Sequence, residues 1–187
     1  KKAVKKTTAS SKKKTKPAKT HIYMLLDRSG SMGSIWAEAL GSVNGYVDDL
    51  RKDVNTKSSP VTLAAFDTIH PFEVVRKALK ASAWQAVTAD EILPRAGTPL
   101  YDAIGKLVSL TENDGAEKGV VIITTDGAEN SSHEYNKTTA TAALDRLRAK
   151  GWQVVFLGAN FNAFAQAAHV GTHVSQTLNA TPQGLRF

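Results

Sequence analysis

The sequence predicts an α/β fold, in which an open, mostly parallel sheet carries helices on both faces. From His21 onward, short apolar runs alternate with segments of helical periodicity. The run GVVIITT at 119–125 is apolar at nearly every position, as expected of a strand that is covered on both faces. Two further runs, 61–66 and 71–76, are joined by the short sequence DTIH, which predicts a hairpin.

A strand and a long helix are expected at the start of this folded body. HIYMLL at 21–26 has the composition of a buried strand. Apolar residues then recur every three or four positions, which is typical of one face of a helix. These residues are Trp36, Leu40, Val43, Val47, Leu50 and Val54. The segment 78–95 predicts no definite element, although Trp84 and Val87 are expected to be packed.

Two more long helices are expected in the second half of the chain. In the sequence GTP at 97–99, Thr98 has the side chain of an N-cap, and proline is favoured at the first helical position. The apolar stripe of this helix is Leu100, Ile104, Leu107 and Val108. The other helix is expected from about 134 to 150, where Gly151 provides a C-terminal stop.

The C-terminal part predicts three short elements. QVVFL at 153–157 is expected to form a strand, and a short helix is expected around 163–168. THVSQTL at 172–178 is expected to be an edge strand.

The charge of the chain is unevenly distributed. Residues 1–19 contain nine lysines and no acidic residue, whereas the rest of the chain contains 15 basic and 17 acidic residues. This composition predicts a disordered lysine-rich tail, 1–19, attached to one folded domain, 20–187. The tail is suited to sequence-independent contact with nucleic acid or with another acidic surface. A solvated tail is the alternative, because no aromatic residue is interleaved for base stacking.

Several classes of site are excluded by composition. The chain has no cysteine, which excludes disulfides, thiolate zinc sites and cysteine nucleophiles and fits a reducing compartment, so that we expect a cytoplasmic protein. Its apolar runs are too short to span a bilayer. The sequence contains neither a GxxxxGK phosphate loop nor a GxSxG nucleophile motif.

Five oxygen-bearing side chains are expected to meet at one edge of the sheet: Asp27, Ser29, Ser31, Thr98 and Asp126. The first three alternate in DRSGSMGS directly after a predicted strand, so an extended backbone points them the same way. Asp126 ends the strand 119–125, and Thr98 opens the helix that precedes it. In open α/β sheets, ligands bind beyond the carboxyl ends of the strands.

This donor set favours a hard divalent cation. Oxygen ligands in near-octahedral geometry suit Mg²⁺ best, with Mn²⁺ close behind. Two carboxylates balance the charge of the ion while the hydroxyls donate weakly, so an open position would remain electrophilic and could accept a carboxylate from a partner. Taken singly, each element has an ordinary alternative as a turn or a helix cap. Their combination at one edge favours the metal site.

Other candidate residues carry weaker signals. His169 and His173 have a helical spacing that suits zinc, but Gly171 lies between them and no third ligand is evident. Glu129 and His133 are the candidates for acid–base chemistry near Asp126.

Four further residues have mainly structural interpretations. Asp102 is expected either to support the metal site from outside or to be a solvated acid on its helix. Asp67 is expected to be a residue of the hairpin turn, and Trp36 and Trp152 are expected to lie in the core.

The combination of DRSGSMGS, GTPLYDAI and TTDGAEN strongly resembles the von Willebrand factor A domain family with its metal-ion-dependent adhesion site. The resemblance covers about residues 20–178. It implies a Rossmann-like sheet with one antiparallel edge strand. It also implies direct metal contacts from Ser29, Ser31 and often Thr98, with Asp27 and Asp126 bound directly or through water, and an acidic residue of a partner as the sixth ligand.

The phrases DGAENSSHEY and GWQVVFLGAN are similar to the small intracellular domains of this family in bacteria and their phages. The resemblance implies work beside AAA+ ATPases or in larger assemblies. A closing C-terminal helix is usual in the family, and few residues follow the last expected strand here.

The leading hypothesis is therefore a metal-dependent protein-binding module without catalysis. A structural or packaging protein whose basic tail binds nucleic acid is the alternative. A metal-dependent hydrolase is the least favoured, because no general base or nucleophile with a persuasive partner accompanies the metal ligands.

Overall fold

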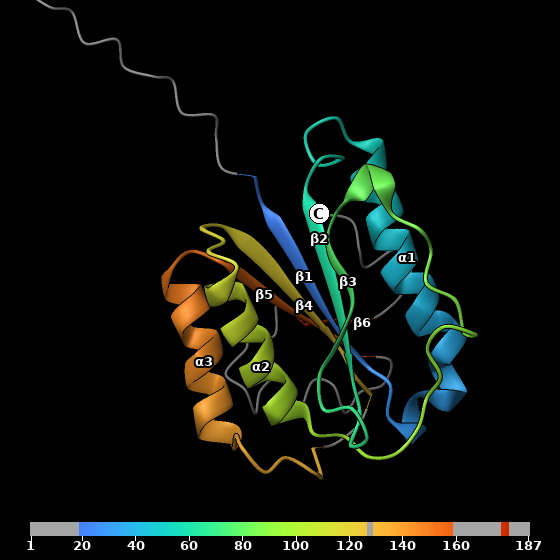
Figure 1. Ribbon diagram of the computed structural model, residues 1–187, viewed down its shortest axis with the longest axis vertical. Helices are drawn as coiled ribbons and strands as arrows, with labels where there is room; N and C mark the ends of the chain where they lie inside the picture. The colour runs from blue at the N-terminus through green and yellow to red at the C-terminus, as the bar shows by residue number, and fades with distance from the viewer. Residues whose placement is uncertain (1–18, 127–128, 159–176, 180–187) are drawn as a thin grey trace, which may run out of the picture.

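A six-stranded sheet lies between two helical layers in the computed structural model, which describes residues 19–126, 129–158 and 177–179 (Figure 1). The strands are β1 His21–Asp27, β2 Pro60–Phe66, β3 Glu73–Lys80, β4 Gly119–Thr124, β5 Gln153–Gly158 and β6 Thr177–Asn179. Their order is β3-β2-β1-β4-β5-β6, and every pair is parallel except β2 with β3. The predicted Rossmann-like fold with one antiparallel edge strand is confirmed.

Among the described residues, three α-helices cover the sheet: α1 Trp36–Lys52, α2 Leu100–Asn113 and α3 Lys137–Ala149. Helix α1 lies on one face of the sheet, and α2 and α3 lie together on the other (Figure 1). Two short 3₁₀ helices, Gly30–Ile35 and Ala81–Ala83, complete the described elements.

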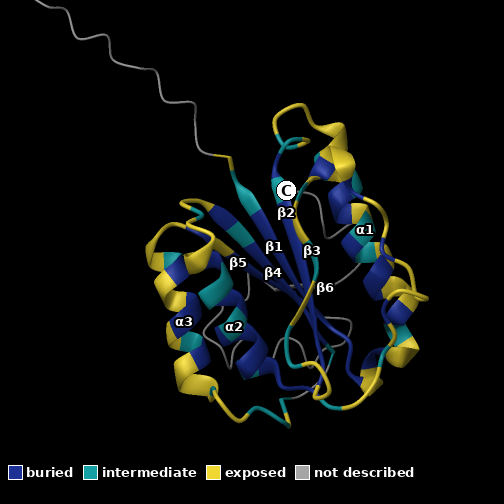
Figure 2. Ribbon diagram, in the orientation of Figure 1, coloured by how far each residue is buried: buried dark blue, intermediate teal, exposed yellow. Residues whose placement is uncertain are grey.

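Strand β1 lies at the centre of the sheet and supplies both core layers. Met24 and Leu26 belong to the cluster under α1, whereas Tyr23 and Leu25 belong to the cluster under α2 and α3, since successive side chains of a strand point to opposite faces. Figure 2 shows this buried centre between helices whose outer faces are exposed. The central strands are held from both sides, which fixes the positions of their carboxyl ends.

The apolar stripe of α1 ends earlier than the sequence predicted. Helix α1 stops at Lys52, and Val54 is 71% exposed instead of packed. Asp53 forms a turn here, because its side-chain oxygen accepts the backbone N–H of Asn55 at 2.8 Å and its carbonyl accepts that of Lys57 at 2.8 Å. Local bonding of this kind competes with continuation of a helix.

The predicted N-cap role of Thr98 is wrong. Helix α2 begins at Leu100, so Pro99 occupies the N-cap position, and the side chain at that position makes no capping hydrogen bond. Thr98 lies one residue too early, and its backbone N–H donates to the side chain of Asn130 at 2.9 Å. The apolar stripe of α2 is confirmed, since Leu100, Ile104, Leu107 and Val108 are all buried.

Helix α3 begins three residues later than expected, at Lys137. Asn136 accepts the N–H of Thr139 at 3.1 Å, and the hydroxyl of Thr139 accepts the N–H of Asn136, which forms a capping box that defines the start. The predicted stop is confirmed, because α3 ends at Ala149 and Gly151 has a φ of +81°.

The second hairpin strand extends further than predicted, as β3 runs from Glu73 to Lys80. Its pairing with β2 contains register shifts, which allow it to continue past the expected end. Trp84 and Val87 are buried as expected. The helix expected at 163–168 lies outside the described residues, and of the expected strand 172–178 only the end is described, in β6.

Among the described residues, no helix is both long and apolar enough to cross a bilayer.

Two helix glycines should respond in opposite ways to alanine. A Cβ at Gly105 in α2 would lie 2.3 Å from the ring of Tyr135, whereas a Cβ at Gly41 in α1 would meet nothing within 4 Å. We expect Gly41→Ala to raise the free energy of unfolding by about 0.5–1 kcal/mol. Gly105→Ala should lower it by about 1–3 kcal/mol, because the tyrosine ring must move. Urea denaturation tests this, and equal stabilisation by both changes would contradict the packing described.

Candidate functional site

The carboxyl ends of two adjacent parallel strands bring the motif residues together. Asp27 is the last residue of β1, and Leu26 pairs with Thr124, the last residue of β4. Asp126 follows two positions after the end of β4. The edge that carries both aspartates is therefore the edge where ligands bind in open α/β sheets.

A chain of hydrogen bonds links four of the five predicted site residues. The backbone N–H of Ser29 donates to Asp27 Oδ1 at 2.7 Å, and the hydroxyls of Ser29 and Ser31 lie 3.1 Å apart. The hydroxyl of Ser31 donates to Asp126 Oδ1 at 3.0 Å. Side chains that are 95 positions apart in the sequence thus touch directly.

The local backbone explains why the two serine hydroxyls meet. Ser29 is extended, with φ −62° and ψ 163°, and the 3₁₀ helix Gly30–Ile35 begins immediately after it. The backbone N–H of Met32 donates to the carbonyl of Ser29 at 3.1 Å, which closes the turn. Met32 is fully buried and anchors the turn in the core below α1.

Asp27 is a buried carboxyl group at the base of the site. It is fully buried, and its Oδ2 accepts the hydroxyl of Thr125 at 2.6 Å. Burial raises the pKa of Asp27 to about 6, although the hydrogen bonds from Thr125 and Ser29 oppose this, and the charge of Asp126 adds to the rise. A cation at this place would stabilise the ionised form of Asp27.

Thr98 lies between the two loops that carry the aspartates. On one side, the N–H of Gly30 donates to the carbonyl of Ala96 at 3.0 Å. On the other, Thr98 and Asn130 exchange two hydrogen bonds, of 2.9 and 3.2 Å. Thr98 is 2% exposed, and its hydroxyl makes no hydrogen bond with the other four site residues in the described structure.

The oxygen donors fit a hard divalent cation. Asp27, Ser29 and Thr98 are buried, whereas Asp126 is half-buried and Ser31 is exposed, so the set is open on its outer side. Within the described ranges, no three His, Cys, Asp or Glu residues are placed to hold a metal, so hydroxyl groups would have to complete any coordination here. Carboxylate and hydroxyl oxygens suit Mg²⁺ or Mn²⁺ better than soft metals.

Glu129 is engaged in holding the start of α2. Its carboxylate accepts the N–H groups of Tyr101, Ser131 and Ser132 at 2.9, 2.8 and 2.7 Å, together with the hydroxyl of Ser132 at 2.7 Å. It thereby caps the helix from a distant loop, in the place where the sequence predicted Thr98. A carboxylate with four donors is poorly available as a general base.

Asp102 also has a structural role that the sequence did not reveal. It is buried, so the expectation of a solvated acid is wrong. Its carboxylate accepts three successive backbone N–H groups, from His133, Glu134 and Tyr135, at 2.7–2.9 Å. Two carboxylates therefore fasten the loop after Asp126 to α2. Glu129, in the loop, binds the start of the helix, and Asp102, in the helix, binds the end of the loop.

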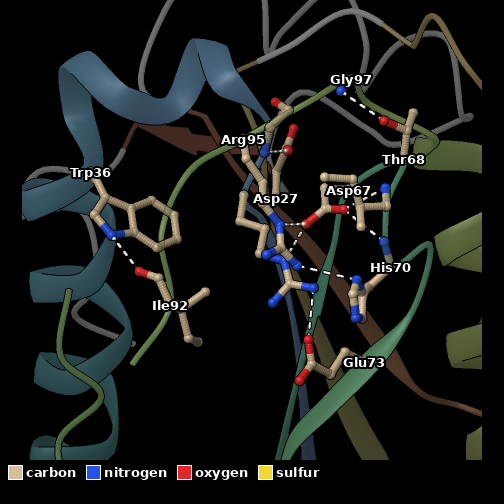
Figure 3. Close-up of polar contacts among 12 residues, drawn as sticks. Asp27, Trp36, Asp67, Thr68, His70, Glu73, Ile92, Arg95 and Gly97 are labelled. Carbon is tan, nitrogen blue, oxygen red and sulfur yellow. Dashed lines mark hydrogen bonds and ion pairs between the residues drawn. The ribbon is translucent and has the colours of Figure 1, made fainter. Parts of the chain in front are cut away.

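Asp67 forms ion pairs beside the site that sequence reasoning missed. Its Oδ1 accepts the N–H groups of Ile69 and His70 at 2.6 and 2.7 Å, as expected of a turn residue. Its Oδ2 also accepts from Nε of Arg28 at 2.6 Å. The same oxygen accepts from Nε of Arg95 at 3.0 Å (Figure 3). The only sequence signal was an aspartate at the end of a buried strand, which does not identify its partners.

The remaining candidates are structural or lie elsewhere. Trp36 and Trp152 are buried as predicted, and the indole N–H of Trp36 donates to the carbonyl of Ile92 at 3.0 Å. His169 and His173 lie outside the described residues.

Comparison with solved structures shows the same fold in proteins of low sequence identity. Manganese-loaded TRAP of Plasmodium vivax is 18% identical with a TM-score of 0.60, over 86% of this chain and 68% of that one. Proximal thread matrix protein 1 from the mussel byssus is 16% identical with a TM-score of 0.61, over 87% of this chain and 43% of that one. This chain thus spans less than half of the mussel protein.

A pilus adhesin, SpaC from Lactobacillus rhamnosus GG, is 12% identical with a TM-score of 0.69, over 91% of this chain and 29% of that one. Another structure of the mussel protein has a zinc-occupied MIDAS motif. Curated protein sequences give no match. The model of the von Willebrand factor type A domain matches residues 21–181, which is most of the chain. The chain therefore belongs to the von Willebrand factor type A domain family.

Proposed function

We propose that the chain is a metal-dependent protein-binding module. Asp27, Ser29, Ser31, Thr98 and Asp126 hold one Mg²⁺ or Mn²⁺ ion, and a partner protein binds there through a glutamate or aspartate. The observation that carries the proposal is the hydrogen-bonded chain from Asp27 through Ser29 and Ser31 to Asp126. Such contacts hold the donor oxygens close together before the ion arrives.

The five proposed ligands differ in burial, and their roles differ accordingly. Asp27, Ser29 and Thr98 are buried and provide a rigid base, while Ser31 and Asp126 lie on the open side. The bound ion would supply a positive charge with room for one carboxylate of the partner. Because only two of the five protein ligands are charged, the site retains attraction for that carboxylate.

Binding is favoured over hydrolysis by the contacts around the site. Glu129, the carboxylate nearest to Asp126 in the following loop, already accepts four hydrogen bonds. The backbone N–H of His133 is bound to Asp102, and its ring makes no hydrogen bond to a site residue in the described part of the chain. A hydrolase needs a positioned base or nucleophile, and neither residue is placed as one.

The partner and the setting are also part of the proposal. The likeness of the sequence to small intracellular domains of bacteria and phages favours a cytoplasmic partner, with an AAA+ ATPase or a larger assembly as the candidates. The absence of cysteine suits such a setting.

Loss of one carboxylate should weaken metal binding without unfolding the protein. We expect the wild-type chain to bind Mn²⁺ in a titration followed by electron paramagnetic resonance, and EDTA to reverse it. Asp126→Asn should weaken the affinity for Mn²⁺ by at least tenfold, because it removes a charged ligand at the half-buried rim of the site. Asp145→Asn, a change to an exposed acid of α3, is the matched control. Unchanged affinity in Asp126→Asn would contradict the assigned ligands.

The basic tail is proposed to contact nucleic acid independently of the metal site. Residues 1–18 lie outside the described structure, so the proposal rests on the nine lysines at 1–19. Deletion of 1–19 should remove binding to a DNA duplex and leave Mn²⁺ affinity unchanged. Binding by the full chain should fall steeply with salt, as counterion release requires. Equal DNA affinity with and without the tail would contradict this role.

A further inference from the structure

We propose that Asp67 is a positioning residue for the metal site, which holds two of the loops that build it in their relative places. The inference rests on the proposed function, because it concerns the same site. Asp67 makes no hydrogen bond with any of the five proposed ligands in the described structure. It acts through two arginines, each of which belongs to a different loop of the site.

Arg28 connects Asp67 to the loop that carries the first three ligands. It lies between Asp27 and Ser29 in the sequence and is 5% exposed. Its Nε lies 2.6 Å from Asp67 Oδ2, and its Nη2 lies 2.7 Å from Glu73 Oε2 on β3. Its guanidinium is thus held by two carboxylates, and its backbone N–H donates to the carbonyl of Phe66 at 3.1 Å, which leaves little freedom to the two ligands on either side of it.

Arg95 connects the same carboxylate oxygen to the segment that leads to Thr98. Its Nε lies 3.0 Å from Asp67 Oδ2, and its Nη2 lies 3.2 Å from the ring of His70 (Figure 3). The backbone N–H of Arg95 also donates to the carbonyl of Arg28 at 2.7 Å. One carboxylate oxygen therefore joins side chains of two loops whose backbones are themselves in contact.

The burial of Asp67 makes this arrangement sensitive to its charge. Its side chain is fully buried, and a buried ion is stable only when it is well paired. Burial alone would raise the pKa of Asp67, but the backbone N–H of His70 and the guanidinium groups of Arg95 and Arg28 outweigh it and lower the pKa. Without this carboxylate, Glu73, whose side chain is 46% exposed, would be the remaining ion-pair partner of buried Arg28 among the described residues.

Asp67→Asn separates the charge from the turn. Asparagine keeps a side-chain oxygen that can accept the N–H groups of Ile69 and His70, so the hairpin turn can form. It removes the negative charge between Arg28 and Arg95, which should let the two loops move apart. The backbone bonds of Gly30 to Ala96 and of Arg95 to Arg28 report on that movement.

The experiment compares Asp67→Asn with Leu107→Ala in the full chain. Leu107, on α2, is fully buried in a core cluster that contains none of the five proposed ligands, so its truncation should lower stability without removing a contact of the site. We expect Asp67→Asn to lose about tenfold or more in Mn²⁺ affinity. In the absence of metal, the amides of Gly30 and Arg95 should exchange faster in Asp67→Asn than in the wild type. The increase should exceed what the loss of global stability, measured by urea denaturation, would cause. Leu107→Ala should bind Mn²⁺ as the wild type does.

The inference is overturned if Asp67→Asn binds Mn²⁺ like the wild type, or if its Gly30 and Arg95 amides are as protected as in Leu107→Ala. Should Asp67→Asn not fold, Arg95→Gln takes its place, because Arg95 is 41% exposed and only one ion pair to Asp67 is lost. It should show a smaller loss in the same direction. A wild-type chain that does not bind Mn²⁺ would contradict the proposed function instead, and amide exchange alone would then decide whether Asp67 joins the loops.

Discussion

The parallel pairing of β1 with β4 is the constraint on which the site depends. It places the carboxyl ends of the two strands side by side, so that Ser31 and Asp126 meet although 95 positions separate them. Both strands are buried on their two faces, by α1 on one side and by α2 and α3 on the other. The loops can vary, but the strand ends from which they start are held by the core.

Charged groups at this edge of the sheet form two sets with different roles. Asp27 and Asp126 form a carboxylate pair with hydroxyl donors, and burial raises the pKa of Asp27 to about 6, so a cation bound there would stabilise its ionised form. Asp67 is instead neutralised by Arg28 and Arg95, so this second set of charged groups needs no metal ion. Asp27 and Asp126 are proposed to bind the metal ion, and Asp67 is proposed to hold the loops that carry the ligands in position.

The sequence predicted those parts of the protein that periodicity and local motifs determine. The central strands, the stripe of α2 and the α/β class follow from apolar spacing. The boundaries that differed were decided by contacts that no local pattern contains. Glu129 caps α2 from another loop, where Thr98 seemed the natural choice, and Asp53 ends α1 before Val54 by forming a turn. The partners of Asp67 come from two distant loops and left no trace in sequence spacing.

The most direct test of the central claim is a crystal structure of the chain grown with Mn²⁺, with the ion located by its anomalous scattering. We expect one strong peak within coordination distance, about 2.0–2.3 Å, of oxygens from Asp27, Ser29, Ser31, Thr98 or Asp126, directly or through one water. Its outward side should be open to water or to a carboxylate of a neighbouring molecule. A peak elsewhere on the molecule, or none at saturating Mn²⁺, would contradict the account.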